Sequence, residues 1–160
     1  MHPRAGELLT LLALQPHPEG GWYREVYRSA DPVTRAGAAR TALTTIYYLL
    51  VAGQLSRWHV VALDEVWHFH EGGPLELLTC DPSRGAVEPL LLGPAGAGGA
   101  RPQQVVRRDV WQAARPLGAY SLVGCTVAPG FDFADFRFLA DLPAAEAIFS
   151  GPLAGHLELR

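Results

Sequence analysis

The chain has 160 residues, of which 49% are hydrophobic and 18% are charged, and its formal net charge is −3. This length and composition predict a single globular domain over residues 1–160 and exclude an intrinsically disordered chain. The scattered basic residues form no stripe, so we expect neither nucleic acid nor a membrane surface as a partner. Because there is no secretion signal and no apolar run of membrane-spanning length, we expect a cytoplasmic protein.

The first predicted element is a helix. Residues 4–14 place leucines at helix-compatible intervals, and Pro16 and Pro18 end the segment. After it, short apolar runs alternate with turn residues, which is typical of β-strands. The predicted strands cover residues 21–29, 44–51, 56–62, 66–70, 75–80, 87–92, 103–106, 119–128 and 131–138.

The segments between and after these runs complete the prediction. Residues 93–102 are rich in glycine and alanine, which offer little to bury, so they predict a flexible loop. They lack the lysine of a phosphate-binding loop. A short helix is predicted over residues 143–149. Cys80 and Cys125 stand in apolar runs and predict buried thiols rather than a disulfide. So many short strands predict an all-β sandwich or barrel.

The stretch DEVWHFHEGG has the residue types of a metal or ligand site. Because side chains alternate along a strand, Glu65, Trp67 and Phe69 should share one face, with His68 and His70 on the other. The two large aromatic residues predict that the face with Glu65 points inward. A single β-bulge would change this assignment, so a pocket role for the two histidines stays open beside a role on the outer face.

The preceding strand, QLSRWHVVA, places Arg57, His59 and Val61 on one face. We expect the turn that follows to fold this strand back beside Glu65, which would make His59 and Glu65 cross-strand neighbours. An unpaired buried charge is costly, so a carboxylate on the inner face needs a partner. His59 and Glu65 are therefore the predicted reactive pair.

These positions resemble the first sequence motif of the cupins. Gly53, His59, Glu65 and Gly72 have the spacing of that motif, and Val61 stands where the motif has its second histidine. The stretches HPEGGWYREVYRS, TTIYYLL, SRWHVVALDEVWHFHEGGPLELL, VWQAA and YSLVGCTVAPGFDFADF resemble the fifth cupin subgroup, small proteins described as a domain of unknown function. The resemblance implies a double-stranded β-helix, or jelly-roll barrel, with a short helix at each end and a pocket between two sheets.

The second cupin motif is placed at residues 107–112, which puts Gln112 where the third metal-binding histidine would stand. A cupin metal site resembles a cage of three histidines and one glutamate. Val61 and Gln112 would remove two of these ligands, so we expect no resident metal. The alternative is a rearranged site for a divalent metal that recruits His68 or His70.

The subgroup resembles the metal-free sugar epimerases of the cupin superfamily in fold, and this resemblance implies a function for the chain. A small polar molecule, sugar-like in character, would bind in the pocket, where His59 acts as a base oriented by Glu65. Tyr23 or Tyr47 is a candidate acid. The alternatives are a metal-dependent cupin oxygenase or isomerase and a non-catalytic protein that binds a small molecule. The candidate ligand-binding residues are Arg57, Trp67, Phe69, His68, His70 and Gln112.

The first predicted strand, residues 21–29, carries Tyr23 and Tyr27 in line on one face. An edge strand leaves backbone donors and acceptors that favour pairing with another chain. Cupins commonly pair such strands across subunits, so the resemblance implies a homodimer that is assembled partly through this strand.

Overall fold

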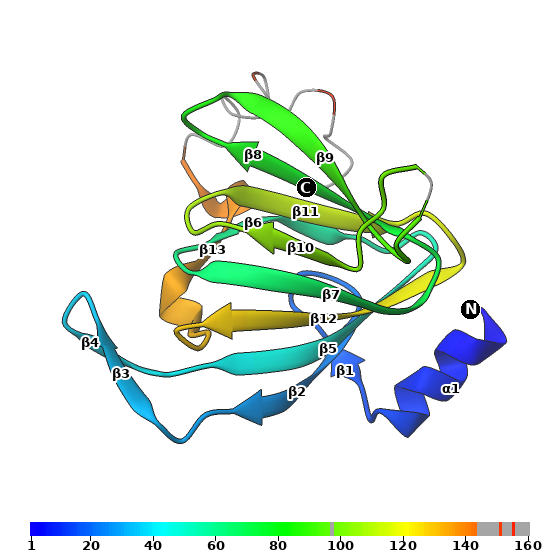
Figure 1. Cartoon of the computed structure of the whole chain (residues 1–160), viewed down its shortest axis with the longest axis horizontal. Coiled ribbons are helices and arrows are strands. Elements are labelled where there is room, and N and C mark those ends of the chain that lie inside the picture. Colours follow the sequence, from blue (N-terminus) through cyan, green and yellow to red (C-terminus); the bar gives the residue numbers. More distant parts are fainter. Residues whose placement is uncertain (97, 144–150, 152–154, 156–160) are drawn as a thin grey trace.

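Two β-sheets stacked face to face make up the body of the molecule (Figure 1). The structure is a computed structural model that describes residues 1–96, 98–143, 151 and 155. Within each sheet, all pairs of neighbouring strands are antiparallel. The prediction of an all-β protein is confirmed.

The six-stranded sheet has the order β1 (Gln15–Pro16), β2 (Trp22–Arg28), β5 (Thr44–Val51), β12 (Tyr120–Ala128), β7 (Asp64–Gly72) and β10 (Gln103–Val106). The five-stranded sheet has the order β13 (Phe136–Phe138), β6 (Ser56–Val61), β11 (Trp111–Pro116), β8 (Leu75–Asp81) and β9 (Ala86–Leu92). A separate hairpin, β3 (Pro32–Arg35) with β4 (Ala38–Thr41), projects beyond the sheets (Figure 1).

The main core lies between the two sheets. Tyr48, Trp67 and Val123 of the six-stranded sheet pack with Leu77 and Ala114 of the five-stranded sheet. These side chains are at most 1% exposed, as expected for the inner faces of a sandwich. Burying one large apolar side chain contributes roughly 1.5–3 kcal/mol, so this shared layer holds the sheets together.

The connection between β6 and β7 determines the geometry of the site. Only Ala62 and Leu63 separate the two strands, yet β6 lies in the five-stranded sheet and β7 in the six-stranded sheet. Leu63 is buried, and the backbone N–H of Ala62 donates to the carbonyl of Asp135 at 2.9 Å. Consecutive strands therefore face each other across the barrel and do not pair as a hairpin.

The N-terminal helix α1 (Pro3–Leu11) packs against the outer face of the six-stranded sheet, where Ala5 and Leu8 contact a cluster that includes Leu49 and Tyr120. His2 caps the helix, because its Nδ1 accepts a hydrogen bond from the backbone of Arg4. The helix is shorter than predicted, since it ends at residue 11. Among the described residues, no helix is long and apolar enough to cross a membrane.

Three parts of the chain differ from the predicted elements. Strand β11 was not predicted, because it is buried on both faces and lacks alternation. The hairpin β3–β4 was also not predicted. The predicted strand 131–138 was wrong in extent, since a 3₁₀ turn at Phe133–Asp135 leaves only β13. The predicted helix 143–149 lies outside the described residues except for residue 143, which is in a turn.

Glu71 joins the N-terminal helix to the sheet. Arg4 donates from Nε and Nη2 to the two Glu71 carboxylate oxygens at 2.7 and 3.0 Å, and the Tyr120 hydroxyl donates at 2.7 Å. The hydrogen bonds from Arg4, followed by the one from Tyr120, hold the pKa of Glu71 at about 2. These contacts should therefore stabilise the fold only while the carboxylate is ionised.

We predict that Arg4→Ala destabilises the protein more at pH 6 than at pH 2. A depressed pKa contributes stability above the unfolded value of 4.5, and this contribution is lost as the pH falls toward 2. Urea unfolding at both pH values measures the effect, with Arg84→Ala at the exposed Glu88 pair as a control. An equal loss at both pH values would contradict the prediction.

Candidate functional site

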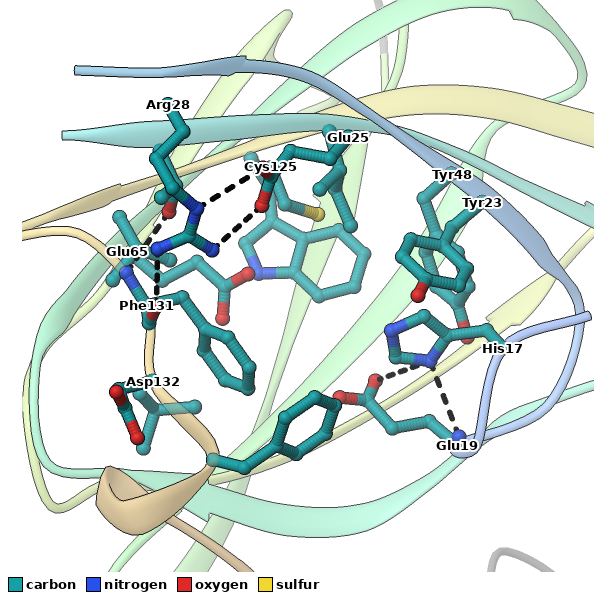
Figure 2. Close-up of a pocket in the computed structure, with 16 residues that line it drawn as sticks. His17, Glu19, Tyr23, Glu25, Arg28, Tyr48, Glu65, Cys125, Phe131 and Asp132 are labelled. Atoms are coloured by element: carbon teal, nitrogen blue, oxygen red, sulfur yellow. Dashed lines mark hydrogen bonds and ion pairs between the residues drawn. The ribbon is translucent and has the colours of Figure 1, made fainter. Parts of the chain in front are cut away.

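A cavity of about 380 Å³ lies against the inner face of the six-stranded sheet (Figure 2). Its wall comes from β2, β5, β7 and β12, from Val61 at the end of β6, from the turn at residues 17–19 and from the segment 131–133 after β12. The volume is in the range of small-molecule sites, and the wall mixes aromatic rings with carboxyl groups. It therefore suits a small molecule with polar groups.

A tight turn before β2 carries two polar groups of the cavity, His17 and Glu19. Gly20 and Gly21 have φ angles of +113° and +68°, in the region that favours glycine. A Cβ on Gly20 would lie 2.1 Å from the carbonyl oxygen of Leu55, and a Cβ on Gly21 would also meet a backbone oxygen, at 2.6 Å. The two glycines therefore let the turn press against the barrel and direct Glu19 inward.

Arg57 fixes this turn from β6. Its backbone N–H donates to the carbonyl of Glu19 at 3.1 Å, and its Nη2 donates to the carbonyl of Pro18 at 2.8 Å. The guanidinium lies over the ring of Phe138, 4.4 Å from the centroid. Arg57 does not line the cavity, so the structure places this predicted ligand-binding residue where it positions the turn.

Glu19 and His59 meet inside the barrel, where they are 8% and 2% exposed. The Nε2 of His59 lies 3.6 Å from one carboxyl oxygen of Glu19, and the Ser56 hydroxyl donates to the other at 2.8 Å. The Nδ1 of His59 lies 2.7 Å from the carbonyl oxygen of Arg57, which can only accept. Nδ1 therefore carries the proton of the neutral ring, and the Nε2 lone pair faces Glu19 at a distance longer than a hydrogen bond.

Glu65 enters the same cavity from β7 and is also 8% exposed. The side-chain amide of Gln112 donates to it at 2.5 Å, and the indole N–H of Trp67 donates to the Gln112 oxygen at 3.1 Å. Because the indole can only donate, it fixes the orientation of the amide and directs the NH₂ group toward Glu65. Gln112 thus acts as a hydrogen-bonding bridge behind the cavity wall.

The expectation that His59 and Glu65 are neighbours within one sheet was wrong. His59 lies on β6 and Glu65 on β7, in opposite sheets, because the short connection after β6 crosses the barrel. Glu19, from the turn, lies beside the Nε2 of His59. Their charges still interact across the interior, since Glu65 acts to raise the pKa of His59 against a larger lowering by burial.

The two histidines of β7, His68 and His70, do not line the cavity. The Nδ1 of His68 lies 3.1 Å from the side-chain nitrogen of Gln103, and the ring of His70 makes an edge contact with Tyr47, 5.9 Å between centroids. The pairing of β7 with β12 shifts at His70, so a bulge is present, but it leaves Glu65 and Trp67 on the cavity side.

The remaining candidates divide between the cavity and the core. Trp67 and Tyr23 line the cavity, whereas Phe69 packs at the edge of the core between the sheets. Tyr47 packs with the helix-side cluster on the outer face. Of the two tyrosines considered as an acid, only Tyr23 therefore lies at the cavity.

His17 and Glu19 were not among the sequence candidates. Their stretch, HPEGGW, carried part of the family resemblance, but no spacing rule connects a turn to a distant strand. A carboxylate directly before Gly-Gly was the available signal, because paired glycines mark a place where the backbone approaches its neighbours closely.

Burial determines the protonation of the cavity groups. It raises the pKa of Glu19 and of Glu65, and the negative charge of Glu19 raises the pKa of Glu65 further. Burial also lowers the pKa of His17 and of His59. The pKa of the Cys125 thiol, which also lines the cavity, lies well above its usual value for the same reason. The imidazoles are therefore held neutral, and the carboxyl groups have raised affinity for protons.

The donor set does not fit a divalent metal of the cupin kind. The positions expected for two of the histidines hold Val61 and Gln112. The Gln112 oxygen, which could ligate a cation, accepts from Trp67, and the Nδ1 of His59 is used by a backbone carbonyl. Over the part of the chain that the structure describes, no group of three or more His, Cys, Asp or Glu side chains could hold a metal ion.

The sequence matches the family described as Cupin superfamily (DUF985) over residues 6–139. No relative was found among curated proteins. A hypothetical protein from Leishmania major is 34% identical with a TM-score of 0.80, over 91% of this chain and 96% of that one. A protein from Shewanella oneidensis is 32% identical with a TM-score of 0.85, over 97% of this chain and 95% of the other.

A more distant structure shows the fold alone. A Klebsiella pneumoniae protein with a double-stranded β-helix domain is 16% identical with a TM-score of 0.53, over 78% of this chain and 89% of that one. The predicted double-stranded β-helix is confirmed by this likeness and by the two facing sheets.

We predict that Gly20→Ala destabilises the protein by about 1–3 kcal/mol more than Gly37→Ala. Both glycines have positive φ, at +113° and +81°, so both variants carry backbone strain. Only the Cβ at residue 20 would clash with a backbone oxygen, whereas residue 37 has nothing within 4 Å. Chemical denaturation of the two variants gives the comparison. Equal losses would show that the turn is not pressed against β6.

A second prediction concerns the stability of the site at different pH values. Burial raises the pKa of Glu65 above 4.5, so its contribution to stability is present below pH 4.5 and is lost as the pH rises through the folded pKa. Glu65→Gln keeps an acceptor for Gln112 and removes this loss. The variant should therefore gain stability relative to the wild type between pH 4.5 and 7, by roughly 1.4 kcal/mol for every pH unit between the two pKa values.

Urea unfolding of both proteins across this range gives the difference directly. The buried histidines have the opposite dependence, because their lowered pKa values reduce stability as the pH falls below 6.5. Both proteins contain them, so their effect largely cancels. A difference that does not change with pH would contradict a raised pKa at Glu65.

Proposed function

This chain belongs to the DUF985 family of the cupin superfamily, and from that premise we propose that its barrel cavity binds a small polar molecule and exchanges a proton with it. The reaction class is a metal-independent isomerisation or epimerisation, in which a proton leaves one face of a carbon and another is delivered. The protein groups that move protons are Glu19, with His59 behind it, and Glu65.

One observation supports this proposal most strongly. Two carboxyl groups, Glu19 and Glu65, are each 8% exposed, line one cavity and reach it from different elements. Burying a carboxyl group without a cation beside it costs free energy. Groups with such unfavourable burial are commonly found in binding or active sites. A cavity with two proton-accepting groups of raised pKa has the composition that general acid–base catalysis requires.

The surroundings of the two carboxyl groups favour different roles. Burial favours the protonated form of both carboxyl groups. At Glu19 this effect is opposed by the hydrogen bond from the Ser56 hydroxyl and by the charge of Arg57, whereas at Glu65 the charge of Glu19 adds to it. Neighbouring titratable groups whose environments differ in this way supply a base and an acid. We therefore propose Glu19 as the base and Glu65 as the acid.

His59 acts through Glu19 and does not itself line the cavity. Its unprotonated Nε2 lies 3.6 Å from a carboxyl oxygen of Glu19, which is longer than a hydrogen bond, so a direct proton transfer would require the two groups to move closer together. His59 is thus a positioning residue beside Glu19. In this proposal Glu19, and not His59, is the base, in place of the reactive pair of His59 and Glu65 that was predicted from the sequence.

Hydrogen exchange tests this function without knowledge of the natural substrate. A panel of sugars, hydroxy acids and keto compounds is incubated with the protein in D₂O, and loss of C–H signals is followed by proton NMR. We expect exchange of at least one member, a loss of roughly 100-fold or more in Glu19→Gln and in Glu65→Gln, and no loss after treatment with chelator.

The matched control is Glu88→Gln, which removes a carboxylate on the exposed side of β9 and should leave exchange unchanged. Exchange that requires an added metal would favour the metal-dependent alternative. Binding of a panel member without any exchange would favour a non-catalytic binding protein.

A further inference from the structure

The charges that surround the cavity are mostly negative. Glu19, Glu25, Glu65 and Asp132 line it, and Arg28 is the guanidinium that reaches it (Figure 2). This balance constrains the chemistry of the bound molecule.

Arg28 is already engaged and is not available to bind an anion. Its Nε and Nη2 donate to the two carboxylate oxygens of Glu25 at 3.0 and 2.7 Å, and its Nη1 donates to the carbonyl of Phe131 at 3.2 Å (Figure 2). A paired Arg and Glu contribute no net charge, so the pair closes one side of the cavity without making it positive. A phosphate or carboxylate would have to break this fork before it could bind.

Among the residues that the structure describes, neither inner carboxyl group forms an ion pair with an arginine or a lysine. Glu65 is bonded by the neutral amide of Gln112 and lies near the Cys125 thiol, and Glu19 is bonded by the neutral hydroxyl of Ser56. The neighbouring imidazoles are held neutral by burial, which lowers their pKa values. A buried carboxylate without a cation is costly, and a cationic ligand would supply the missing charge.

Aromatic rings complete the environment. Tyr23, Tyr48 and Trp67 line the same cavity, and Tyr23 and Tyr48 both contact the ring of His17, with centroids 4.4 and 5.2 Å away. The faces of such rings attract ammonium groups, and cages that combine aromatic rings with carboxylates are suited to recognising them. Neutral sugars also stack on aromatic rings and can donate hydroxyl groups to a carboxylate, but they do not neutralise its charge.

We propose that the molecule bound in this cavity is a small organic cation, an amino sugar or amino alcohol whose ammonium group lies between the aromatic rings and the Glu19 carboxylate. The inference rests on the proposed function, since it assigns the ligand class of the same cavity. It specifies an amine-bearing molecule in place of the neutral, sugar-like molecule that the family resemblance implies.

Matched pairs of probes test the charge directly. Choline is compared with 3,3-dimethyl-1-butanol, which has the same shape without the charge, and glucosamine is compared with glucose. Isothermal titration calorimetry on the full chain at pH 7.5 measures each affinity. We expect the cation of at least one pair to bind tenfold or more tightly than its neutral partner. Glu19→Gln should remove most of this preference, and Glu88→Gln should keep it.

The outcomes separate this inference from the proposed function. If glucose or another uncharged panel member binds or exchanges in a Glu19-dependent way and neither cation is preferred, the inference is wrong and the proposed function stands. If a cation is preferred and no carbon-bound hydrogen exchanges, the ligand class stands and the catalytic proposal fails. If none of the four probes binds, the inference is overturned, and D₂O exchange remains the test of the proposed function.

Discussion

The arrangement of this molecule depends on two carboxyl groups, Glu19 and Glu65, that are held inside a β-barrel with neutral hydrogen-bonding partners. Water would solvate them far better, so the fold must offset their burial with the apolar layer between its sheets. The groups around them offset part of this cost. Ser56 and Gln112 donate hydrogen bonds to the two carboxyl groups, and the unprotonated Nε2 of His59 lies 3.6 Å from Glu19.

The same constraint explains the construction of the turn before β2. Glu19 reaches the interior only because its loop lies against β5 and β6, and Gly20 permits an approach that any Cβ would block. Arg57 of β6 then holds the loop in place by donating two hydrogen bonds, to the backbone carbonyls of Glu19 and Pro18. A surface loop thus contributes a group of the site, while the sheets provide rigid support.

The sequence predicted the parts of the site that depend on local geometry. Alternation along β7 correctly placed Glu65 and Trp67 on the cavity side, because the bulge at His70 comes after both residues. It could not predict that β6 and β7 lie in different sheets, because a connection of two residues is also typical of a hairpin within one sheet. It also could not connect Glu19 to His59, because contacts between a loop and a distant strand leave no periodic pattern. Strand β11 was missed for a related reason, since burial on both faces removes the alternation that marks a strand.

The central claim is that His59 is a neutral ring with its proton on Nδ1 and its lone pair directed at Glu19. Nitrogen-15 NMR of the histidine side chains at pH 7 measures this directly. We expect a protonated Nδ1 and an unprotonated Nε2 for His59, and a change in the Nε2 resonance when Glu19→Gln is introduced. A ring protonated on Nε2 alone, or an Nε2 resonance that does not respond to Glu19→Gln, would contradict this arrangement.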